Sequence, residues 1–374
     1  MRRVRVLNDR VVHTFHRAWT GVLIVDRFVR LHQLFFTAVW ALLGAASVGR
    51  DLALGELSVL LGVVGAFHVY TYVLNDVIDL PIDRTQPQRS GDPLVSGAIQ
   101  PWQALLIALA QPVVAVLLTT LLGGSWRAYA TLLGGFALMG AYNLWGKRCY
   151  FPPLTDAIQG CAWGSLAIYA PLALGEAPGV LAWTVAVYVA VFTLLFNGVH
   201  GSLRDLANDF STGARTTAIV LGARRAPDAE DAYVPRALAV FASVVLAALI
   251  ATSTALVLRN DFGYAQTGWV ITALAVGALN FFAVVLQPAV VRPRGLAWDR
   301  AWRLQLYLLM MAPFVAFLGH LSILMLIVLL SLNAVALLLF GCSSLVAQWA
   351  ALALRSVVRR ADERRLSAGI PRTQ

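Results

Sequence analysis

Long apolar runs separated by short polar stretches follow one another along the whole chain. A transmembrane helix needs about 20 mostly apolar residues, and the pattern predicts ten such helices. They are Leu31–Val48, Leu57–Leu80, Trp102–Leu122, Ala128–Trp145, Ala157–Leu174, Val180–Val199, Leu238–Leu258, Thr267–Val290, Leu304–Leu318 and Leu321–Leu345. The last two come from one apolar run that Gly319-His320 divides, and without that division the number is nine. The pattern therefore predicts an all-α, polytopic membrane protein with nine or ten transmembrane helices.

Composition agrees with this assignment and excludes other classes. Hydrophobic residues make up 59% of the 374 residues and charged residues 13%, whereas soluble domains are near one half apolar and one quarter charged. A soluble enzyme, a disordered chain and a nucleic-acid-binding domain are excluded despite the formal net charge of +10. The three cysteines lie far apart, so neither a disulfide framework nor a zinc-binding spacing is available.

The basic residues predict the orientation in the membrane. In the ten-helix arrangement, only Arg50, Arg127 and Arg259 of the 29 basic residues fall on one side. Because basic residues concentrate on the cytoplasmic side, both termini are predicted to be cytoplasmic. We expect a basic cytoplasmic segment over residues 1–30, a membrane domain over 31–345, and a basic amphipathic tail over 346–374 on the inner leaflet. The preference for arginine over lysine favours a bacterial cell membrane as the location.

Two acidic motifs lie at predicted cytoplasmic helix ends. The first is Asn75-Asp76-Val77-Ile78-Asp79-Leu80-Pro81-Ile82-Asp83-Arg84, and the second is Arg204-Asp205-Leu206-Ala207-Asn208-Asp209. On a helix, Asn75, Asp79 and Asp83 form one stripe, as do Asp205 and Asp209. Like charges at this spacing repel, and more so near a bilayer. A positive species between the motifs is therefore expected.

A hard divalent cation fits this requirement. Mg²⁺ is commonly held by one or two carboxylates together with substrate phosphates, so two facing carboxylate pairs could hold metal ions that bind a diphosphate. The plainer alternative is that these side chains only reach toward water at helix ends and pair with nearby arginines. Two matching motifs at matching helix ends favour the metal interpretation.

The motifs resemble those of a known family. NDVIDLPIDR, followed by Arg89 and by Pro93-Leu94-Val95-Ser96-Gly97, resembles the first signature of the UbiA superfamily of intramembrane prenyltransferases. RDLANDFSTGARTTA resembles the second signature, and AYNLWGKR between them resembles the family's tyrosine-to-basic segment. The similarity covers roughly residues 27 to 290, and the order and cytoplasmic placement of the motifs match.

This resemblance implies a ring of helices, typically nine, around a central cavity that opens toward lipid. It also implies Mg²⁺ as cofactor and an isoprenoid diphosphate as substrate. In this chain Asn75, Asp79 and Asp83 would hold one Mg²⁺, and Asp205 and Asp209 the other. Asp79, Asp83, Asp205 and Asp209 would be the catalytic residues of the site, whereas Asp76 points off the stripe and could pair with an arginine.

Further candidates lie beside the motifs. Arg89, Lys147 and Arg215 are predicted to contact the diphosphate, and Lys147 is the single lysine of the chain. Tyr142 is a diphosphate candidate with a buried structural role as the alternative. The remaining candidates are polar or aromatic residues that could line the cavity, each of which could instead be a satisfied interhelical group: His68, Tyr72, Asn197 and His200, with Phe67, Tyr70 and Trp163 as aromatic neighbours for a carbocation.

The leading functional hypothesis is transfer of a prenyl group to a small, aromatic or otherwise lipophilic acceptor. A terpene cyclase of the same superfamily, which acts on the diphosphate alone, is the main alternative. A polyprenyl-phosphate phosphoribosyltransferase ranks lower because Arg-Thr-Gln-Pro-Gln-Arg follows Asp83 in place of a His-Pro with paired basic residues. A transporter ranks lower because the carboxylates lie at the surface level rather than at the bilayer midplane. No nucleic-acid partner is expected, and neither the acceptor nor the oligomeric state follows from the sequence.

Overall fold

The computed structural model describes residues 21–86, 89–225, 232–292 and 295–339. The chain divides into two compact units, one formed by Met1–Phe35 with Leu330–Gln374 and the other by Phe36–Leu329. The described part of the first unit includes the helical segment Gly21–Val29 and the 3₁₀ helix η1 (Leu31–Gln33). All predicted site residues belong to the second unit.

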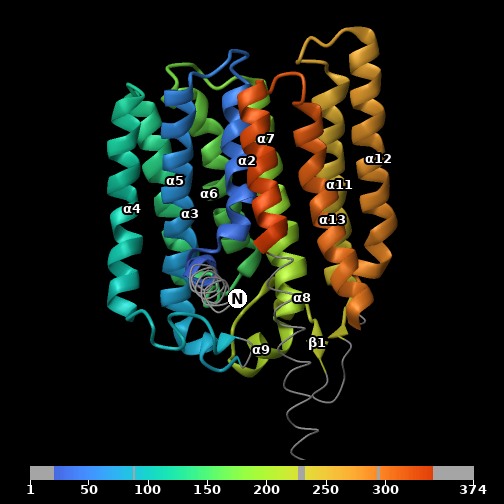
Figure 1. The fold of residues 1–374 in the computed structure, drawn as a ribbon. Helices are drawn as coiled ribbons and strands as arrows, with labels where there is room; N and C mark the ends of the chain where they lie inside the picture. Colours follow the sequence, from blue (N-terminus) through green and yellow to red (C-terminus); the bar gives the residue numbers. More distant parts are fainter. Residues whose placement is uncertain (1–20, 87–88, 226–231, 293–294, 340–374) are drawn as a thin grey trace, which may run out of the picture. The chain divides into compact units, whose positions relative to one another are not determined.

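The second unit is built from helices (Figure 1). In chain order the elements are α2 (Leu34–Ala46, which begins in the first unit), α3 (Leu54–Asp83), α4 (Pro101–Leu121), α5 (Trp126–Trp145), α6 (Pro152–Ala173), α7 (Val180–Leu195), the π-helix η3 (Phe196–Gly201), α8 (Ser202–Arg204), α9 (Leu206–Ser211), α10 (Thr217–Val220), β1 (Arg224–Arg225), β2 (Ala232–Tyr233), α11 (Arg236–Leu258), α12 (Gln266–Val290) and α13 (Gly295–Ala316). The two short strands pair antiparallel. A shorter apolar helix covers Ile323–Leu339.

Each predicted span coincides with a helix over its described residues, so the all-α membrane architecture is confirmed. Among the described residues, five helices are long and apolar enough to cross a membrane, or six if Gly21–Val29 and Leu31–Ala46 form one bent span. The number nine or ten stays a prediction. Helices α5 and α6 fall outside the five, and both carry polar residues such as Asn143, Asp156 and Gln159. The predicted tail 346–374 and residues 1–20 lie outside the described residues.

Local sequence signals account for several helix ends. Pro101 and Pro152 are the first residues of α4 and α6, where the missing N–H of proline costs nothing. The Ser125 hydroxyl accepts a hydrogen bond from the Ala128 amide at 3.3 Å and so caps α5. These ends place the loops that carry the acidic motifs. The loop after α3 and helices α8 and α9 lie at the same end of the helices (Figure 1).

Helices α6 and α7 approach each other closely through small residues. A Cβ atom added at Gly160 would lie 2.5 Å from the Ala190 carbonyl oxygen, and one at Gly164 would lie 2.7 Å from that of Ala186. The glycines are four residues apart and face alanines that are also four apart, as in the small-xxx-small packing of membrane helices. This packing fixes α7, and with it the segment that leads to the second acidic motif.

We predict that Gly160→Ala lowers stability, because the added methyl group must push the α6 and α7 backbones apart. The expected loss is about 1–3 kcal/mol, the usual scale for overpacking, measured as the thermal unfolding midpoint of the detergent-purified protein. Gly134→Ala on α5 is the matched control, since nothing lies within 4 Å of a Cβ at that position. Equal midpoints for the two variants would contradict the close packing.

Candidate active site

The first acidic motif occupies the end of α3. Asp79 and Asp83 are buried, with exposed fractions of 8% and 3%, and the Asn75 amide donates a hydrogen bond to Asp79 Oδ2 at 3.2 Å. Asn75, Asp79 and Asp83 thus lie on one continuous helix, in the spacing that the sequence pattern indicates. Burial of this many carboxylates requires nearby positive charge.

Arg89, in the loop that follows α3, supplies part of that charge. Its guanidinium donates a hydrogen bond to Asp83 at 2.8 Å and lies 3.7 Å from Asp76 and 3.9 Å from Asp92. Arg89 therefore lies within ion-pair distance of Asp76. The sequence had left such an arginine pairing open for Asp76. The loop folds back over the end of α3 as a result.

Lys147 lies two residues beyond the end of α5, and its ammonium contacts Asp79 Oδ2 at 2.9 Å. Burial acts to lower the pKa of Lys147, but the carboxylates of Asp79 and Asp209 outweigh it and raise the pKa. Lys147 is therefore a permanent cation that interacts with both acidic motifs. This contact brings together segments that are far apart in the sequence.

The second acidic motif differs from the continuous helix that its spacing predicts. Span six ends in the π-helix η3, and Asp205 has φ −95° and ψ 5° at the break between α8 and α9. The helix nevertheless resumes at once, because the Asp209 amide donates to the Asp205 carbonyl at 2.9 Å. Two glycines, Gly198 and Gly201, lie in η3, and π-helical turns are frequent at functional sites.

The two aspartates of this motif have different environments. Burial acts to raise the pKa of Asp205, but hydrogen bonds from Arg204 at 2.7 and 2.9 Å outweigh it and lower the pKa. Burial raises the pKa of Asp209 to about 6, although the Lys147 charge acts in the opposite direction. Asp209 is 2% exposed, and its Oδ1 atom has no hydrogen-bond partner among the described residues.

Two further contacts hold the second motif against the rest of the site. The Thr85 hydroxyl, just after α3, donates to the Ile82 carbonyl oxygen at 2.7 Å and also contacts Asn208 Oδ1 at 3.2 Å. The Arg215 amide donates to the Lys147 carbonyl oxygen at 2.9 Å. The ends of α3, α5 and α9 are therefore connected by direct contacts.

The Arg215 side chain has a different environment from its backbone. Its guanidinium lies over the Tyr150 ring, 4.4 Å from the ring centre, and the residue is exposed. No ion pair joins Arg215 to the acidic motifs among the described residues. A role for Arg215 in binding diphosphate stays a prediction.

Tyr142 belongs to a polar cluster that connects α5, α6 and η3. The Asn197 amide donates to the Tyr142 hydroxyl at 2.7 Å and also to Gln159 Oε1. Tyr142 lies in the last turn of α5, whereas Lys147 follows the end of that helix. The cluster therefore lies on the membrane side of the carboxylates.

The two histidine candidates and Tyr72 occupy different places. His68 is 1% exposed, lies 2.7 Å from the Thr37 hydroxyl, and contacts the Tyr72 ring. His200 is fully buried, stacks on Trp302, and is hydrogen-bonded to Gln305 of α13 at 3.0 Å. The other ring nitrogen, Nδ1, has no hydrogen-bond partner among the described residues, so both roles that the sequence left open for His200 stay predictions.

Sequence reasoning missed four residues. Asp156 is buried and accepts a hydrogen bond from the Thr217 hydroxyl at 2.5 Å, and Gln159 completes the Tyr142 cluster. Asn208 and Thr216 each carry a buried polar atom without a partner among the described residues. An acidic residue and a glutamine at the start of an otherwise apolar span were available signals for the first two. The other two give no signal in the sequence because their importance depends on tertiary contacts.

The side chains of the two motifs offer the hard oxygen donors that a divalent cation such as Mg²⁺ prefers. Among the described residues, no three His, Cys, Asp or Glu side chains are grouped closely enough to form a metal site by themselves. Mg²⁺ does not require such a group, since it keeps waters and shares its ligands with phosphates. The donors here are carboxylate and amide oxygens, and Asp209 Oδ1 has no hydrogen-bond partner in the described part of the chain. The residues present therefore fit Mg²⁺ held together with a substrate phosphate.

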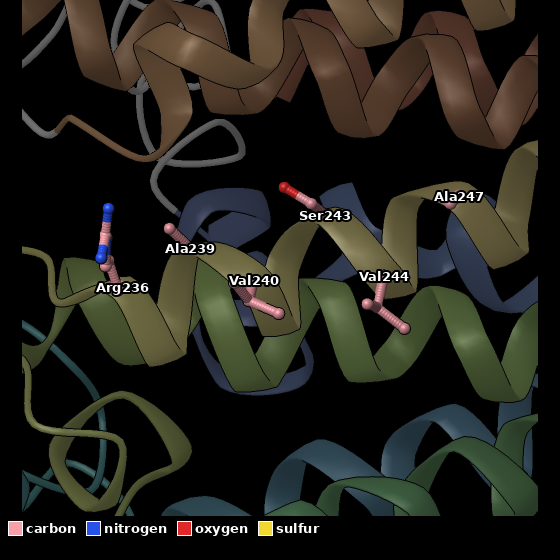
Figure 2. A pocket seen from close by; sticks show the side chains of 6 residues that line it. All are labelled: Arg236, Ala239, Val240, Ser243, Val244 and Ala247. Carbon is pink, nitrogen blue, oxygen red and sulfur yellow. The ribbon is translucent and has the colours of Figure 1, made fainter.

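A surface groove runs along one face of α11 (Figure 2). Its lining residues are Arg236, Ala239, Val240, Ser243, Val244 and Ala247. They recur every three or four residues and so form one face of the helix. None of the predicted site residues lines this groove.

Comparison with known proteins identifies the class. The model of the UbiA prenyltransferase family matches residues 34–304, and the chain therefore belongs to this family. Its fold is similar to that of a UbiA homolog from Archaeoglobus fulgidus bound to GPP and Mg²⁺, with a TM-score of 0.54 and 14% identity over 79% of this chain and 99% of that one.

Relatives with named activities differ in their acceptors. A 4-hydroxybenzoate octaprenyltransferase of Pseudoalteromonas atlantica is 26% identical over 198 residues, which cover 53% of this chain and 66% of the relative. A protoheme IX farnesyltransferase of a Cyanothece species is 31% identical over 165 residues, 43% of this chain and 48% of the relative. The chain thus spans about half to two thirds of these relatives, and the comparisons leave its own acceptor open.

We predict that Lys147→Met lowers stability, because it leaves the buried Asp79 carboxylate without its ammonium partner. The expected loss is about 1–3 kcal/mol, and part of it should be recovered in the double variant Lys147→Met with Asp79→Asn. The thermal unfolding midpoints of the purified variants measure the loss of stability and its recovery. The control is Arg50→Met, which breaks the exposed 2.7 Å pair with Glu56 and should cost less than about 1 kcal/mol. An equal loss at Arg50 would contradict a special role for the Lys147 pair.

Proposed function

We propose that the protein transfers a prenyl group from an isoprenoid diphosphate to a small, aromatic or otherwise lipophilic acceptor, with Mg²⁺ as cofactor. The observation that carries this proposal is the meeting of the two acidic motifs at Lys147: its ammonium contacts Asp79 at 2.9 Å, and its carbonyl oxygen accepts at 2.9 Å from the amide of Arg215, just after the second motif. Carboxylates for metal ions and cations for phosphate are thereby placed side by side. The similar UbiA homolog from Archaeoglobus fulgidus is bound to the same kinds of ligand, GPP and Mg²⁺.

In this proposal the first motif holds one metal ion through Asn75, Asp79 and Asp83, and the second holds another through Asp205 and Asp209. The bound cations offset the charge that develops on the departing diphosphate. Lys147 and Arg89 lie beside these carboxylates and would donate hydrogen bonds to the phosphate oxygens. Their charges are fixed before the reaction begins, so little reorganisation is required.

The allylic carbon of the donor would lie on the membrane side of the diphosphate. Tyr72 lies on this side of the site, on α3 and one turn before Asn75. The centre of its ring lies 6.2 Å from that of Trp163 and 4.7 Å from that of His68. Aromatic faces stabilise positive charge, so Tyr72 and Trp163 are suited to an allylic cation. The apolar helix surfaces beyond them are suited to the prenyl chain.

An acceptor is favoured over cyclisation by the cluster of Tyr142, Gln159 and Asn197. It places hydroxyl and amide groups on the membrane side of the carboxylates, where a cyclase would need an inert apolar surface around its cation. Such groups can orient the polar atom of an acceptor. The cyclase is therefore the second candidate, and the acidic motifs are proposed to face the cytoplasm of a bacterial cell.

We predict that turnover requires both motifs and a divalent cation. Asp79→Asn and Asp209→Asn should each abolish release of diphosphate from geranyl diphosphate, because each removes a carboxylate that would hold the metal. EDTA should have the same effect on the wild-type protein, and added Mg²⁺ should reverse it. Asp51→Asn, an exposed residue outside the motifs, is the control. Turnover that survives chelation would exclude both the transferase and the cyclase.

We predict that product analysis separates these two activities. The purified protein, given geranyl diphosphate, Mg²⁺ and a panel of phenolic acceptors, should yield prenylated acceptor. Gln159→Leu should reduce this transfer at least tenfold, because the amide that helps to orient the acceptor is lost, while diphosphate release without acceptor continues. Cyclic hydrocarbon or alcohol formed without any acceptor, and no prenylated product with one, would support the cyclase instead.

A further inference from the structure

The π-helix η3 connects α7 to the second acidic motif, and its register decides how that motif is oriented. A π-helix closes its hydrogen bonds between residues i and i+5 and so holds more residues in a turn than an α-helix. Removal of one residue from the turn would rotate every following side chain by about 100° around the helix axis. Asp205 and Asp209 come directly after η3. The positions of both aspartates therefore depend on whether η3 keeps its π-helical register.

Contacts at the start of η3 support this register. The Ser202 backbone amide bonds to the Asn197 carbonyl oxygen, five residues earlier, and the Ser202 hydroxyl donates to the same oxygen at 2.7 Å. The Asn197 side chain donates to the Tyr142 hydroxyl at 2.7 Å and so joins this end of η3 to α5. Because π-helical turns are rare, the far end of η3 also needs a tie.

His200 supplies that tie to α13. Its Nε2 atom lies 3.0 Å from Gln305 Oε1, and neither side chain is exposed. The Gln305 amide nitrogen donates at 2.8 Å to the Ala283 carbonyl oxygen and at 2.8 Å to Gln287 Oε1, both on α12. The Gln305 oxygen therefore faces His200, so His200 Nε2 carries the proton and donates it to this bond. One glutamine thus connects η3, α12 and α13.

This polar connection is a costly way to hold helices together. His200 Nδ1 and the Gln287 amide nitrogen have no hydrogen-bond partner in the described part of the chain, and unpaired buried polar groups cost free energy. Apolar side chains of similar volume often replace such groups without loss of stability. The His200 ring also stacks on Trp302, with ring centres 6.0 Å apart, a contact that phenylalanine could make equally well. The hydrogen bonds therefore serve position rather than stability.

We propose that the hydrogen bond from His200 to Gln305 holds η3 in its π-helical register and thereby positions Asp205 and Asp209. His200 and Gln305 act as positioning residues and contact no substrate. This inference rests on the proposed function, in which the two aspartates hold a metal ion. It gives α12 and α13, which carry neither acidic motif, a part in the reaction. Gln305 directly follows the last residue that the family model matches, 304.

Hydrogen exchange of the ligand-free protein in detergent tests the positioning step by itself. Gln305→Leu leaves His200 without its acceptor, so the backbone amides of residues 202–211 should exchange about tenfold faster, as expected for loss of one hydrogen bond. Tyr188→Phe is the matched control. It breaks the bond from the Tyr188 hydroxyl to the Leu309 carbonyl oxygen, which joins α7 to α13 one turn beyond Gln305. Exchange of residues 202–211 should stay unchanged in this variant.

Binding of labelled geranyl diphosphate at a series of Mg²⁺ concentrations tests the consequence for the site. The Mg²⁺ concentration for half-maximal binding should rise about tenfold in Gln305→Leu and in His200→Phe, the scale for groups that orient metal ligands. The double variant should need no more Mg²⁺ than either single variant, because both changes remove the same interaction. Tyr188→Phe should bind as wild type does.

A conservative replacement separates the hydrogen bond from the presence of the ring. His200→Gln keeps an amide donor near the place of Nε2, so it should need Mg²⁺ within about twofold of wild type. His200→Asn has an amide too, but its side chain is one carbon shorter and does not reach Gln305. It should therefore behave like His200→Phe.

The outcomes separate this inference from the proposed function. If wild-type protein shows no Mg²⁺-dependent binding of geranyl diphosphate, the proposed function is overturned, whereas faster exchange in Gln305→Leu but not in Tyr188→Phe would still support the positioning of the motif. If wild type binds, but Gln305→Leu and His200→Phe need no more Mg²⁺ than wild type, the inference alone is overturned. Equal exchange of residues 202–211 in Gln305→Leu and Tyr188→Phe would also overturn it, since the tie would then serve only general packing.

Discussion

Carboxylates buried near a membrane must be balanced by positive charge, and the organisation of this protein's site depends on that balance. Asp79 and Asp83 at the end of α3 and Asp209 on α9 are nearly inaccessible, and like charges so close together repel. Lys147 contacts Asp79, and Arg89 contacts Asp83. The two cations come from the end of α5 and from the loop after α3, so the charge balance also determines which helix ends must meet.

The same balance makes the site suitable for a metal ion and a diphosphate. In the structure the cations neutralise the carboxylates, and Asp209 Oδ1 has no partner among the described residues. In the proposed function the carboxylates hold Mg²⁺ and the cations contact phosphate, so each group exchanges one partner for another of the same sign.

Specificity for an acceptor has a different physical basis from binding of the donor. Family members act on acceptors as different as 4-hydroxybenzoate and protoheme, so the acidic motifs alone cannot encode the choice. The cluster of Tyr142, Gln159 and Asn197 lies on the membrane side of these motifs and joins three helical segments. Its amides and hydroxyl are positioned by packing, because α6 and α7 are brought close by Gly160 and Gly164.

The sequence by itself determined the helices, the membrane class, the family and the positions of the acidic motifs, because apolar runs and i, i+4 spacings are local properties. It also indicated that Asp76 could pair with an arginine. It did not predict the π-helix η3, because two alternative helical turns differ too little in their local pattern. Nor did it predict which polar side chains would contact each other, such as His200 with Gln305, Thr217 with Asp156, and Thr85 with Asn208. These pairs are 105, 61 and 123 residues apart in the chain, and only the packing of whole helices decides which faces meet.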